Sequence, residues 1–340
     1  MQMIRVEDAV GSVLCHDITR IIPGKAKGPA FKKGHIVGEQ DIAELLKLGK
    51  EHLYVWELSS GLVHEDDAAL RIARVLQGEG MALTEPSEGK VKLVARTDGL
   101  CVINEERLLQ INMVEEIVVA TVSNARPVKN GDTLAGVRVV PLVIAEEKLA
   151  LVEKIARGGG VMAVRPFIPY RVGVITTGSE VYHGRIKDEF GPVVRKKVEA
   201  FGCQVINHII VPDDRGRIAG AIRELLAGGA EVILTTGGMS VDPDDVTPSA
   251  IKEAGATIVT YGAPVLPGAM LMVAYIGEVP VLGLPGCVMY HKTTVFELVL
   301  PWVLTGQKVT RPMIAKLGLG GLCLECDVCH YPKCSFGTGA

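Results

Sequence analysis

The chain has 340 residues, enough for two or three domains that each bury their own core. Only 4% of the residues are aromatic, the formal net charge is -3, and no long run of lysine or arginine occurs. This composition argues against a nucleic-acid or membrane partner, which would need a basic surface or a series of stacking rings. We therefore expect a small-molecule ligand.

The first residues, MQMIRVEDAVGS, do not show the basic stretch, apolar core and small-residue cleavage site of a secretory signal. No apolar run reaches the length of a membrane span. We expect a cytoplasmic protein. In that reducing environment, a cluster among the eight cysteines indicates metal or redox chemistry more than structural disulfides.

Residues 1–62 predict an N-terminal α/β segment. Short apolar strands are expected between residues 4 and 21 and at 52–56, and residues 40–48 place their apolar side chains on one face of a helix. Residues 63–167 predict a smaller, β-rich α+β region. There, β-branched segments alternate with turn signals between two expected helices, at 65–77 and 145–157.

Residues 168–308 alternate strands and helices. Such alternation implies right-handed crossovers and a parallel sheet covered by helices on both faces, which is a three-layer α/β domain. Ligands of such sheets bind beyond the carboxyl ends of the strands. The expected strands cover 171–177, 204–211, 231–236 and 280–284, and the expected helices cover 191–201, 215–226 and 288–304.

The loop after the third of these strands carries the chemistry of a phosphate site. Gly237 and Gly238 allow positive φ and let an anion approach backbone N–H groups, and Ser240 adds a hydroxyl donor.

Carboxylates follow this loop at Asp242, Asp244 and Asp245. They repel one another unless a cation such as Mg²⁺, or several hydrogen-bond donors, neutralises them. The alternative is that Asp244 or Asp245 caps the helix that begins at Thr247.

The whole stretch TTGGMSVDPDDVTP, residues 235–248, resembles the signature of the MoaB/Mog-type molybdopterin-binding domain. In that family a strand ends in a Gly-Gly loop before an Asp-Val-Thr-Pro helix start. Three further segments match in the same order: TTGSEV (176–181), GRIKDEFGPVV (184–194) and LGLPG (282–286).

This resemblance implies the site residues. Asp245, Asp188 and Glu180 take the catalytic positions, and Asp242 and Asp245 are the implied Mg²⁺ ligands. The implied molybdopterin-binding positions are Thr177, Gly178, Ser179, Thr236, Gly237, Gly238, Ser240, Thr247, Pro285 and Gly286.

Residues 6–19 and 31–55 are similar to the opening segments of the molybdopterin molybdenumtransferase (MoeA) family, which inserts molybdate into adenylylated molybdopterin. The resemblance implies a transferase that uses Mg²⁺, takes molybdopterin or its adenylylated form and molybdate as substrates, and releases AMP. It also implies a homo-oligomer, with other cofactor-assembly proteins as candidate partners.

The chain departs from that family at three segments. Residues 266–269 read Leu-Pro-Gly-Ala where the family carries Lys-Pro-Gly-Lys, and residues 284–288 read Leu-Pro-Gly-Cys-Val where it carries Leu-Pro-Gly-Asn-Pro. The family's Ser-Ala-Met-Asp-Gly-Tyr segment is absent after residue 20. Two alternatives to molybdate insertion therefore stay open: a molybdopterin adenylyltransferase, and a non-catalytic molybdopterin-binding carrier or sensor.

Residues 309–340 predict a cysteine-rich tail. Its four cysteines are separated by two, two and four residues. The short spacings can direct pairs of sulfurs to one centre, and four thiolates complete a zinc site or an iron–sulfur cluster. The alternative is a disordered, reduced tail between glycine-rich flanks. Because the thiols follow the last expected helix, the α/β domain is expected to fold without them. These thiols belong to Cys323, Cys326, Cys329 and Cys334.

A further cysteine, Cys287, follows the Leu-Pro-Gly turn at the start of an expected helix. A helix N-terminus stabilises a thiolate, so this position predicts a lowered thiol pKa.

Overall fold

The structure is a computed structural model that describes residues 2–22, 26–55, 61–240 and 245–339. The chain forms two compact units. No helix in the described ranges is long and apolar enough to cross a membrane. The first unit comprises Met1–Arg96, Ile103–Val122 and Gly131–Ala163, and the second comprises Thr97–Val102, Ser123–Asn130 and Val164–Ala340.

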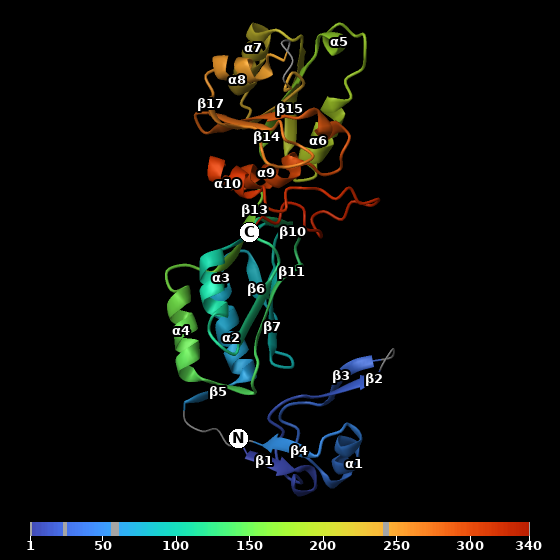
Figure 1. Ribbon diagram of the computed structural model, residues 1–340, viewed down its shortest axis with the longest axis vertical. Helices are drawn as coiled ribbons and strands as arrows, with labels where there is room; N and C mark the ends of the chain where they lie inside the picture. Colours follow the sequence, from blue (N-terminus) through green and yellow to red (C-terminus); the bar gives the residue numbers. More distant parts are fainter. Residues whose placement is uncertain (1, 23–25, 56–60, 241–244, 340) are drawn as a thin grey trace. The chain divides into compact units, whose positions relative to one another are not determined.

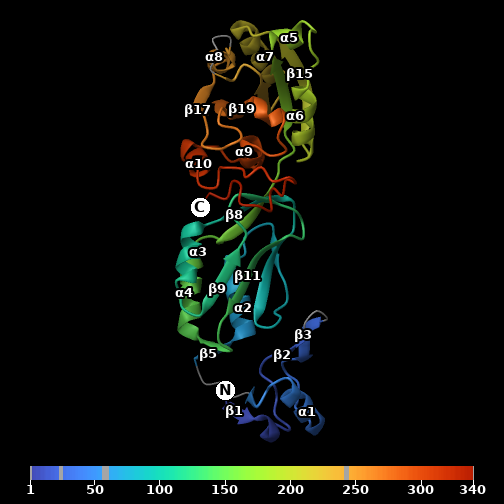
Figure 2. The ribbon, with the colours of Figure 1, turned by 45° about the vertical axis from the view of Figure 1, so that its right-hand side comes forward.

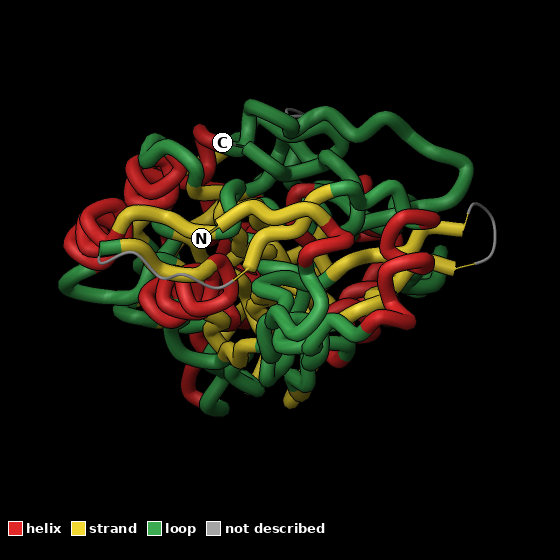
Figure 3. Tube along the Cα trace, turned by 90° about the horizontal axis from the view of Figure 1, so that it is seen from below, coloured by secondary structure: helices red, strands yellow, loops and turns green. Residues whose placement is uncertain are grey.

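The first unit begins with short elements around a small apolar core. Strand β1 pairs antiparallel with β4, and β2 pairs antiparallel with β3, which lies beside it in Figure 3. Leu14, Leu45 and Leu53 are buried in the core of this group. The bounds are β1 Gln2–Arg5, η1 Val6–Asp8, β2 Ile18–Ile22, β3 Ala26–Phe31, α1 Glu39–Lys47 and β4 His52–Val55.

The rest of the first unit is an antiparallel sheet of order β6-β7-β11-β9. Helices α2 and α3 pack on this sheet, and α4 packs against both helices (Figure 2). Burial alternates along β7, because one face of the sheet lies against helices. This is the β-rich α+β region expected from the sequence, with α3 as an additional helix. The bounds are β5 Leu62–His64, α2 Glu65–Leu76, β6 Met81–Leu83, β7 Lys90–Ala95, α3 Glu105–Asn112, β9 Ile117–Thr121, β11 Thr133–Val139, β12 Val143–Ala145 and α4 Glu146–Ala156.

The second unit is built on a six-stranded sheet of order β15-β14-β16-β19-β18-β17. The four strands from β15 to β19 are parallel, as predicted, whereas β18 and β17 are antiparallel to their neighbours. The bounds are β14 Arg171–Thr177, β15 Gln204–Val211, β16 Val232–Thr236, β17 Thr257–Tyr261, β18 Met272–Ile276 and β19 Val279–Leu284. Strands β8 (Gly99–Ile103), β10 (Arg126–Val128) and β13 (Met162–Pro166) form a separate sheet of order β10-β8-β13.

The antiparallel edge has a local cause. Only Gly277 and Glu278 connect β18 to β19, and Gly277 has a φ of 58°. A two-residue turn joins antiparallel neighbours only, and it favours a glycine at positive φ.

Helices cover both faces of this sheet, α7 and α8 on one side and α6 and α9 on the other (Figure 1). Consecutive residues of a strand serve opposite layers: Val174 packs with α6 and α9, and Ile175 packs with α7 and α8. The predicted three-layer α/β domain is confirmed. The bounds are α5 Ser179–Tyr182, α6 Phe190–Glu199, α7 Arg215–Ala227, α8 Thr247–Glu253, α9 Val295–Leu304 and α10 Arg311–Lys316.

The helix expected over 288–304 begins later than predicted. A short 3₁₀ turn, η2 (Gly286–Met289), follows β19, and α9 starts at Val295. Thr294 caps α9, because its Oγ1 accepts a hydrogen bond from the Phe296 N–H at 3.1 Å and its own N–H donates to Glu297 Oε2 at 2.7 Å. This capping box fixes where the helix begins.

The segment after α10 packs onto the α/β domain. Phe336 is 5% exposed and belongs to the same core as α9, and the Tyr331 hydroxyl donates to the Glu297 carbonyl at 3.0 Å. The tail therefore contributes a side chain to the core of the domain, while the expectation that the domain folds without the tail thiols stays a prediction.

Candidate functional site

The loop after β16 is closed by a buried threonine. Gly237 and Gly238 have φ values of 85° and 56°, a region that L side chains rarely adopt. Thr247, the first residue of α8, donates its hydroxyl to the Gly237 carbonyl at 3.0 Å. A Cβ atom on Gly238 would lie 2.6 Å from Thr247 Oγ1. Glycine is thus required at position 238 by both conformation and space.

The same loop leaves backbone donors available. Within the described residues, neither the Gly237 N–H nor the Gly238 N–H donates a hydrogen bond. Successive N–H groups at positive φ form a concave site that attracts anions. The Gly-Gly loop can therefore accept an oxyanion such as a phosphate.

Tyr261, on the edge strand β17, supports this loop from the side. Its hydroxyl donates to the Met239 carbonyl at 2.9 Å and lies 3.3 Å from the Ser240 carbonyl. Burial raises the pKa of Tyr261, and the negative charge of Asp245 adds to the effect. The sequence prediction missed Tyr261 because β17 itself was not predicted.

A pocket of about 410 Å³ opens at the carboxyl ends of β16 and β19. It brings together six residues predicted from the sequence, namely Gly237, Gly238, Ser240, Asp245, Pro285 and Gly286. The other lining residues are Met239, Ala269, Met270, Leu284 and Cys287. A pocket of ordinary ligand-pocket size thus lies at the strand ends, and ligand binding by these residues stays a prediction.

Other predicted site residues do not line this pocket. Thr236, Thr177 and Thr247 are buried behind the loop. Ser179 is engaged with Asp213, because the Ser179 N–H donates to Asp213 Oδ2 at 2.7 Å and Ser179 Oγ accepts from the Asp213 N–H at 3.3 Å. The remaining ones are Gly178, Glu180 and Asp188.

Asp188 holds the start of α6. Its Oδ1 accepts hydrogen bonds from the backbone N–H groups of Phe190 and Gly191, at 2.9 and 3.0 Å. Its Oδ2 lies 3.3 Å from His208 Nε2 and accepts from the Thr176 hydroxyl at 3.3 Å. These contacts favour a structural role for Asp188 over the predicted catalytic one.

The described residues do not assemble a Mg²⁺ site. Of the predicted ligands, Asp245 lines the pocket, whereas Asp242, with Asp244, lies outside the described residues. No three His, Cys, Asp or Glu side chains in the described part of the chain are gathered as metal ligands, and this includes the cysteines of the tail. Asp245 is thus the predicted Mg²⁺ ligand that the described residues place at the pocket, and a further carboxylate, waters or a substrate phosphate would have to complete the coordination of the ion.

The prediction for Cys287 is wrong. Burial raises the pKa of this thiol, and the charge of Glu297 adds to the rise. The reason is that only the short 3₁₀ turn η2 begins at Gly286, so no long helix stabilises a thiolate there.

Lys197, which the sequence prediction missed, anchors the segment after the pocket. Its Nζ lies 2.5 Å from Glu297 Oε1 and donates to the carbonyls of His291 and Lys292 at 3.1 and 3.4 Å. The Thr294–Glu297 capping box could have indicated the start of α9, but no local signal points to Lys197, which is 100 residues away from Glu297 in the sequence.

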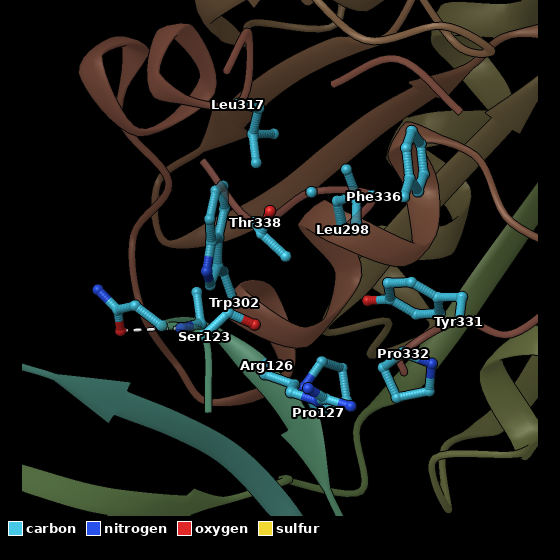
Figure 4. Close-up of a pocket in the computed structure, with 13 residues that line it drawn as sticks. Ser123, Arg126, Pro127, Leu298, Trp302, Leu317, Tyr331, Pro332, Phe336 and Thr338 are labelled. Atoms are coloured by element: carbon cyan, nitrogen blue, oxygen red, sulfur yellow. Dashed lines mark hydrogen bonds between the residues drawn. The ribbon is translucent and has the colours of Figure 1, made fainter. Parts of the chain in front are cut away.

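A second pocket lies beside α9, among Leu298, Trp302, Tyr331 and Phe336 (Figure 4). Its volume of about 20 Å³ is room for a single water molecule. Of these two pockets, the one at the strand ends has room for a small-molecule ligand.

Residues 173–305 match the family described as "Probable molybdopterin binding domain". This match contains the Gly-Gly loop, the Leu-Pro-Gly turn and every residue of the pocket. The chain contains a molybdopterin-binding domain. A separate match, over residues 3–57, is to a domain family of unknown function.

Relatives of the molybdopterin-binding domain occur in several protein classes. A molybdopterin molybdenumtransferase from Synechococcus elongatus is 30% identical over 149 residues, which are 41% of this chain and 36% of the relative. A molybdopterin adenylyltransferase from Pyrococcus furiosus is 34% identical over 83 residues, 24% of this chain and 48% of the relative. A CinA-like protein from Desulfosudis oleivorans is 38% identical over 81 residues, 24% of this chain and 19% of the relative. The chain thus spans less than half the length of each of these relatives.

Among solved structures, the molybdopterin biosynthesis enzyme MoaB from Thermus thermophilus is similar at 23% identity with a TM-score of 0.33. The match covers 41% of this chain and 98% of that protein.

Proposed function

We propose that this chain acts in molybdenum cofactor biosynthesis by binding molybdopterin, or its adenylylated form, in the pocket at the ends of β16 and β19, and by inserting molybdate with release of AMP. The observation that carries the proposal is the pair of donor groups on Gly237 and Gly238 at the rim of a pocket of about 410 Å³. Relatives named for molybdenum transfer and for adenylyl transfer support the substrate class.

In this proposal the terminal phosphate lies against the Gly-Gly loop. The backbone N–H groups of Gly237 and Gly238 and the Ser240 hydroxyl donate to its oxygens. The ring system lies against the apolar wall of Met239, Met270 and Leu284. Asp245, at the same pocket, is the candidate catalytic carboxylate.

A second candidate function is supported by the charge of the pocket. Among the lining residues that the structure describes, Asp245 is acidic and none is basic. Molybdate is a dianion, and Ala269 stands where the transferase family carries a lysine. A carrier or sensor that binds the pterin without inserting molybdate fits this charge distribution.

One reaction series distinguishes the candidates. Purified full-length protein is incubated with adenylylated molybdopterin, molybdate and Mg²⁺, or with molybdopterin, ATP and Mg²⁺, and the products are identified by mass. AMP and a molybdenum-bearing pterin are expected in the first mixture. Adenylylated pterin in the second mixture would indicate the adenylyltransferase instead.

Unchanged pterin that elutes with the protein would indicate the carrier or sensor. Failure to bind either pterin would overturn the proposed function as a whole. A homo-oligomer, other cofactor-assembly partners and a cytoplasmic location stay predictions from the sequence.

A further inference from the structure

In the segment after α10, residues 324–330 contribute no side chain to the hydrophobic core. This stretch contains no helix or strand in the described residues, and its apolar side chains are exposed, with Leu324 at 74% and Val328 at 63%. Small segments without a core of their own are commonly organised by a metal ion. The four cysteines of the tail lie in and on either side of this stretch, at Cys323, Cys326, Cys329 and Cys334.

The ends of the segment are brought together. The Gly337 N–H donates to the Gly320 carbonyl at 2.9 Å, which closes the intervening residues into a loop. Cys323 and Cys334 each lie three positions inside this closure, and both pack against the core that contains α9. Loop closure therefore limits how far apart the first and fourth cysteines can lie, because only three residue steps separate each of them from the closing hydrogen bond.

The middle thiols are exposed. Cys326 and Cys329 are free thiols at the surface, and Cys329 Sγ lies 3.3 Å from Thr293 Oγ1. Two residues separate Cys323 from Cys326 and Cys326 from Cys329, a spacing at which one turn directs two sulfurs to one centre, and four residues separate Cys329 from Cys334. Exposed loop residues reorient at little cost, because few contacts must be broken.

We propose that Cys323, Cys326, Cys329 and Cys334 bind one thiolate-held metal centre, either a zinc ion or an iron–sulfur cluster. In the described residues the four sulfurs are not yet gathered around one point. Binding draws Cys326 and Cys329 toward the pair held by the loop closure, and the thiols release their protons as the metal–sulfur bonds form.

This centre is attached to both loops of the pocket. The Cys323 N–H donates to the Leu266 carbonyl at 2.8 Å, and the Leu266 N–H donates to the Gly321 carbonyl at 2.8 Å. Leu266 lies just before Ala269 and Met270, which line the pocket. The second connection runs through Cys329, which contacts Thr293. Thr293 lies a few residues after Pro285 and Gly286, which line the pocket.

Metal binding is therefore expected to order residues 263–270 and 285–294 together. Pterin binding by these loops rests on the proposed function. The metal centre and the ordering of the loops are independent of it.

The test begins with full-length protein purified without oxygen and supplied with Zn²⁺, or with Fe³⁺, sulfide and a thiol reductant that converts part of the iron to Fe²⁺. One centre per chain is expected by elemental analysis. Zinc without acid-labile sulfide identifies a zinc ion, and iron with acid-labile sulfide identifies a cluster. Protein that holds neither metal in stoichiometric amount overturns the proposal.

Point variants test the ligands, since truncation would also remove Phe336 from the core. Cys326→Ser is expected to lower metal affinity by about 100-fold or more, because even the loss of a hydrogen-bond partner of a metal ligand costs roughly 10- to 100-fold. Asp327→Ser, at the neighbouring exposed position, is the matched control and is expected to bind normally. Normal metal binding by both Cys326→Ser and Cys329→Ser would overturn the four-thiolate assignment.

Two measurements on the unmodified chain do not depend on how the variants fold. Metal is expected to protect the four tail thiols from alkylation, and unprotected thiols in the metal-loaded protein would contradict the assignment. Metal is also expected to slow amide hydrogen exchange in residues 263–270 and 285–294. Unchanged exchange there would remove the link to the pocket, and neither readout involves a pterin.

Discussion

Strands β14 and β16 are hydrogen-bonded neighbours, and both end in Thr-Thr-Gly, with Thr176 paired to Thr236. The loops that follow differ in where their backbone donors go. After β14, the Gly178 N–H donates to the Val211 carbonyl and the Ser179 N–H donates to Asp213, both from the chain leaving β15. After β16, the described residues supply no acceptor to the two glycines.

The same Thr-Thr-Gly sequence therefore has a different hydrogen-bonding environment at the end of each strand. The β14 loop lies beside the edge strand β15, whose last residue, Val211, accepts one hydrogen bond, and Asp213, just after that strand, accepts the other, so the loop is structural. The β16 loop lies beside a pocket, and the described residues leave its two N–H donors without an acceptor, which is what the proposed phosphate site requires.

The largest expected effect is on turnover. Asp245→Asn is expected to lower molybdate insertion by about 100-fold or more, because a positioned carboxylate in proton transfer contributes roughly 10²- to 10⁴-fold. Glu180→Gln is the comparison variant, since Glu180 is exposed on the β14 side and outside the pocket. Steady-state AMP release measures both. Equal turnover in Asp245→Asn and the unmodified protein would remove Asp245 from the reaction.

The next effect is on binding. Gly238→Val is expected to weaken the binding of a phosphorylated pterin on the order of 100-fold, because two hydrogen bonds to a charged group, at about 1.5 kcal/mol each, are lost. Gly184→Val is the matched control. Gly184 also has positive φ, at 68°, but a Cβ atom added there would meet no atom within 4 Å. Titration calorimetry compares the two, and equal affinities would break the distinction between the loops.

A change in the β14 loop is expected to alter stability instead. Asp213→Ala leaves the Ser179 N–H without its acceptor, at a cost of about 1–3 kcal/mol in the free energy of unfolding. Pterin affinity is expected to stay nearly unchanged. Asp213→Asn keeps an acceptor oxygen and is expected to recover part of the loss in urea denaturation. A large loss of pterin affinity in Asp213→Ala would place the β14 loop at the ligand after all.

The smallest effect concerns pH. Burial lowers the pKa of His208, which lies beside Thr176 and Asp188. The negative charge of Asp188 counteracts this shift in part, and the positive charge of Arg195 adds to it. The unfolded chain therefore binds a proton more readily than the folded one. Stability is unaffected above the unfolded pKa of about 6.5 and falls as the pH drops below it.

His208→Gln is expected to reduce this loss, measured as the difference in melting temperature between about pH 7.5 and about pH 5.5, on either side of the unfolded pKa. The difference between variant and unmodified protein is the relevant quantity, because burial also lowers the pKa of His16 and His64. An identical pH dependence in both proteins would contradict the role of His208.

The sequence by itself determined the elements whose signals are local. The apolar runs at 171–177 and 204–211 became β14 and β15 with those bounds, and the Gly-Gly and Leu-Pro-Gly turns lie at the strand ends where the pattern placed them. These features depend on hydrophobic periodicity and on glycine at positive φ, both of which act over a few residues.

Only the tertiary structure decided which of those residues meet. Tyr261 and Lys197 contact the pocket loops from distant segments, and Asp188 accepts hydrogen bonds from the start of α6. Phe336 joins the core from the far end of the chain, which no local pattern predicted. The physical reason is that burial and hydrogen-bond satisfaction depend on neighbours in space, whereas a sequence pattern reports only neighbours along the chain.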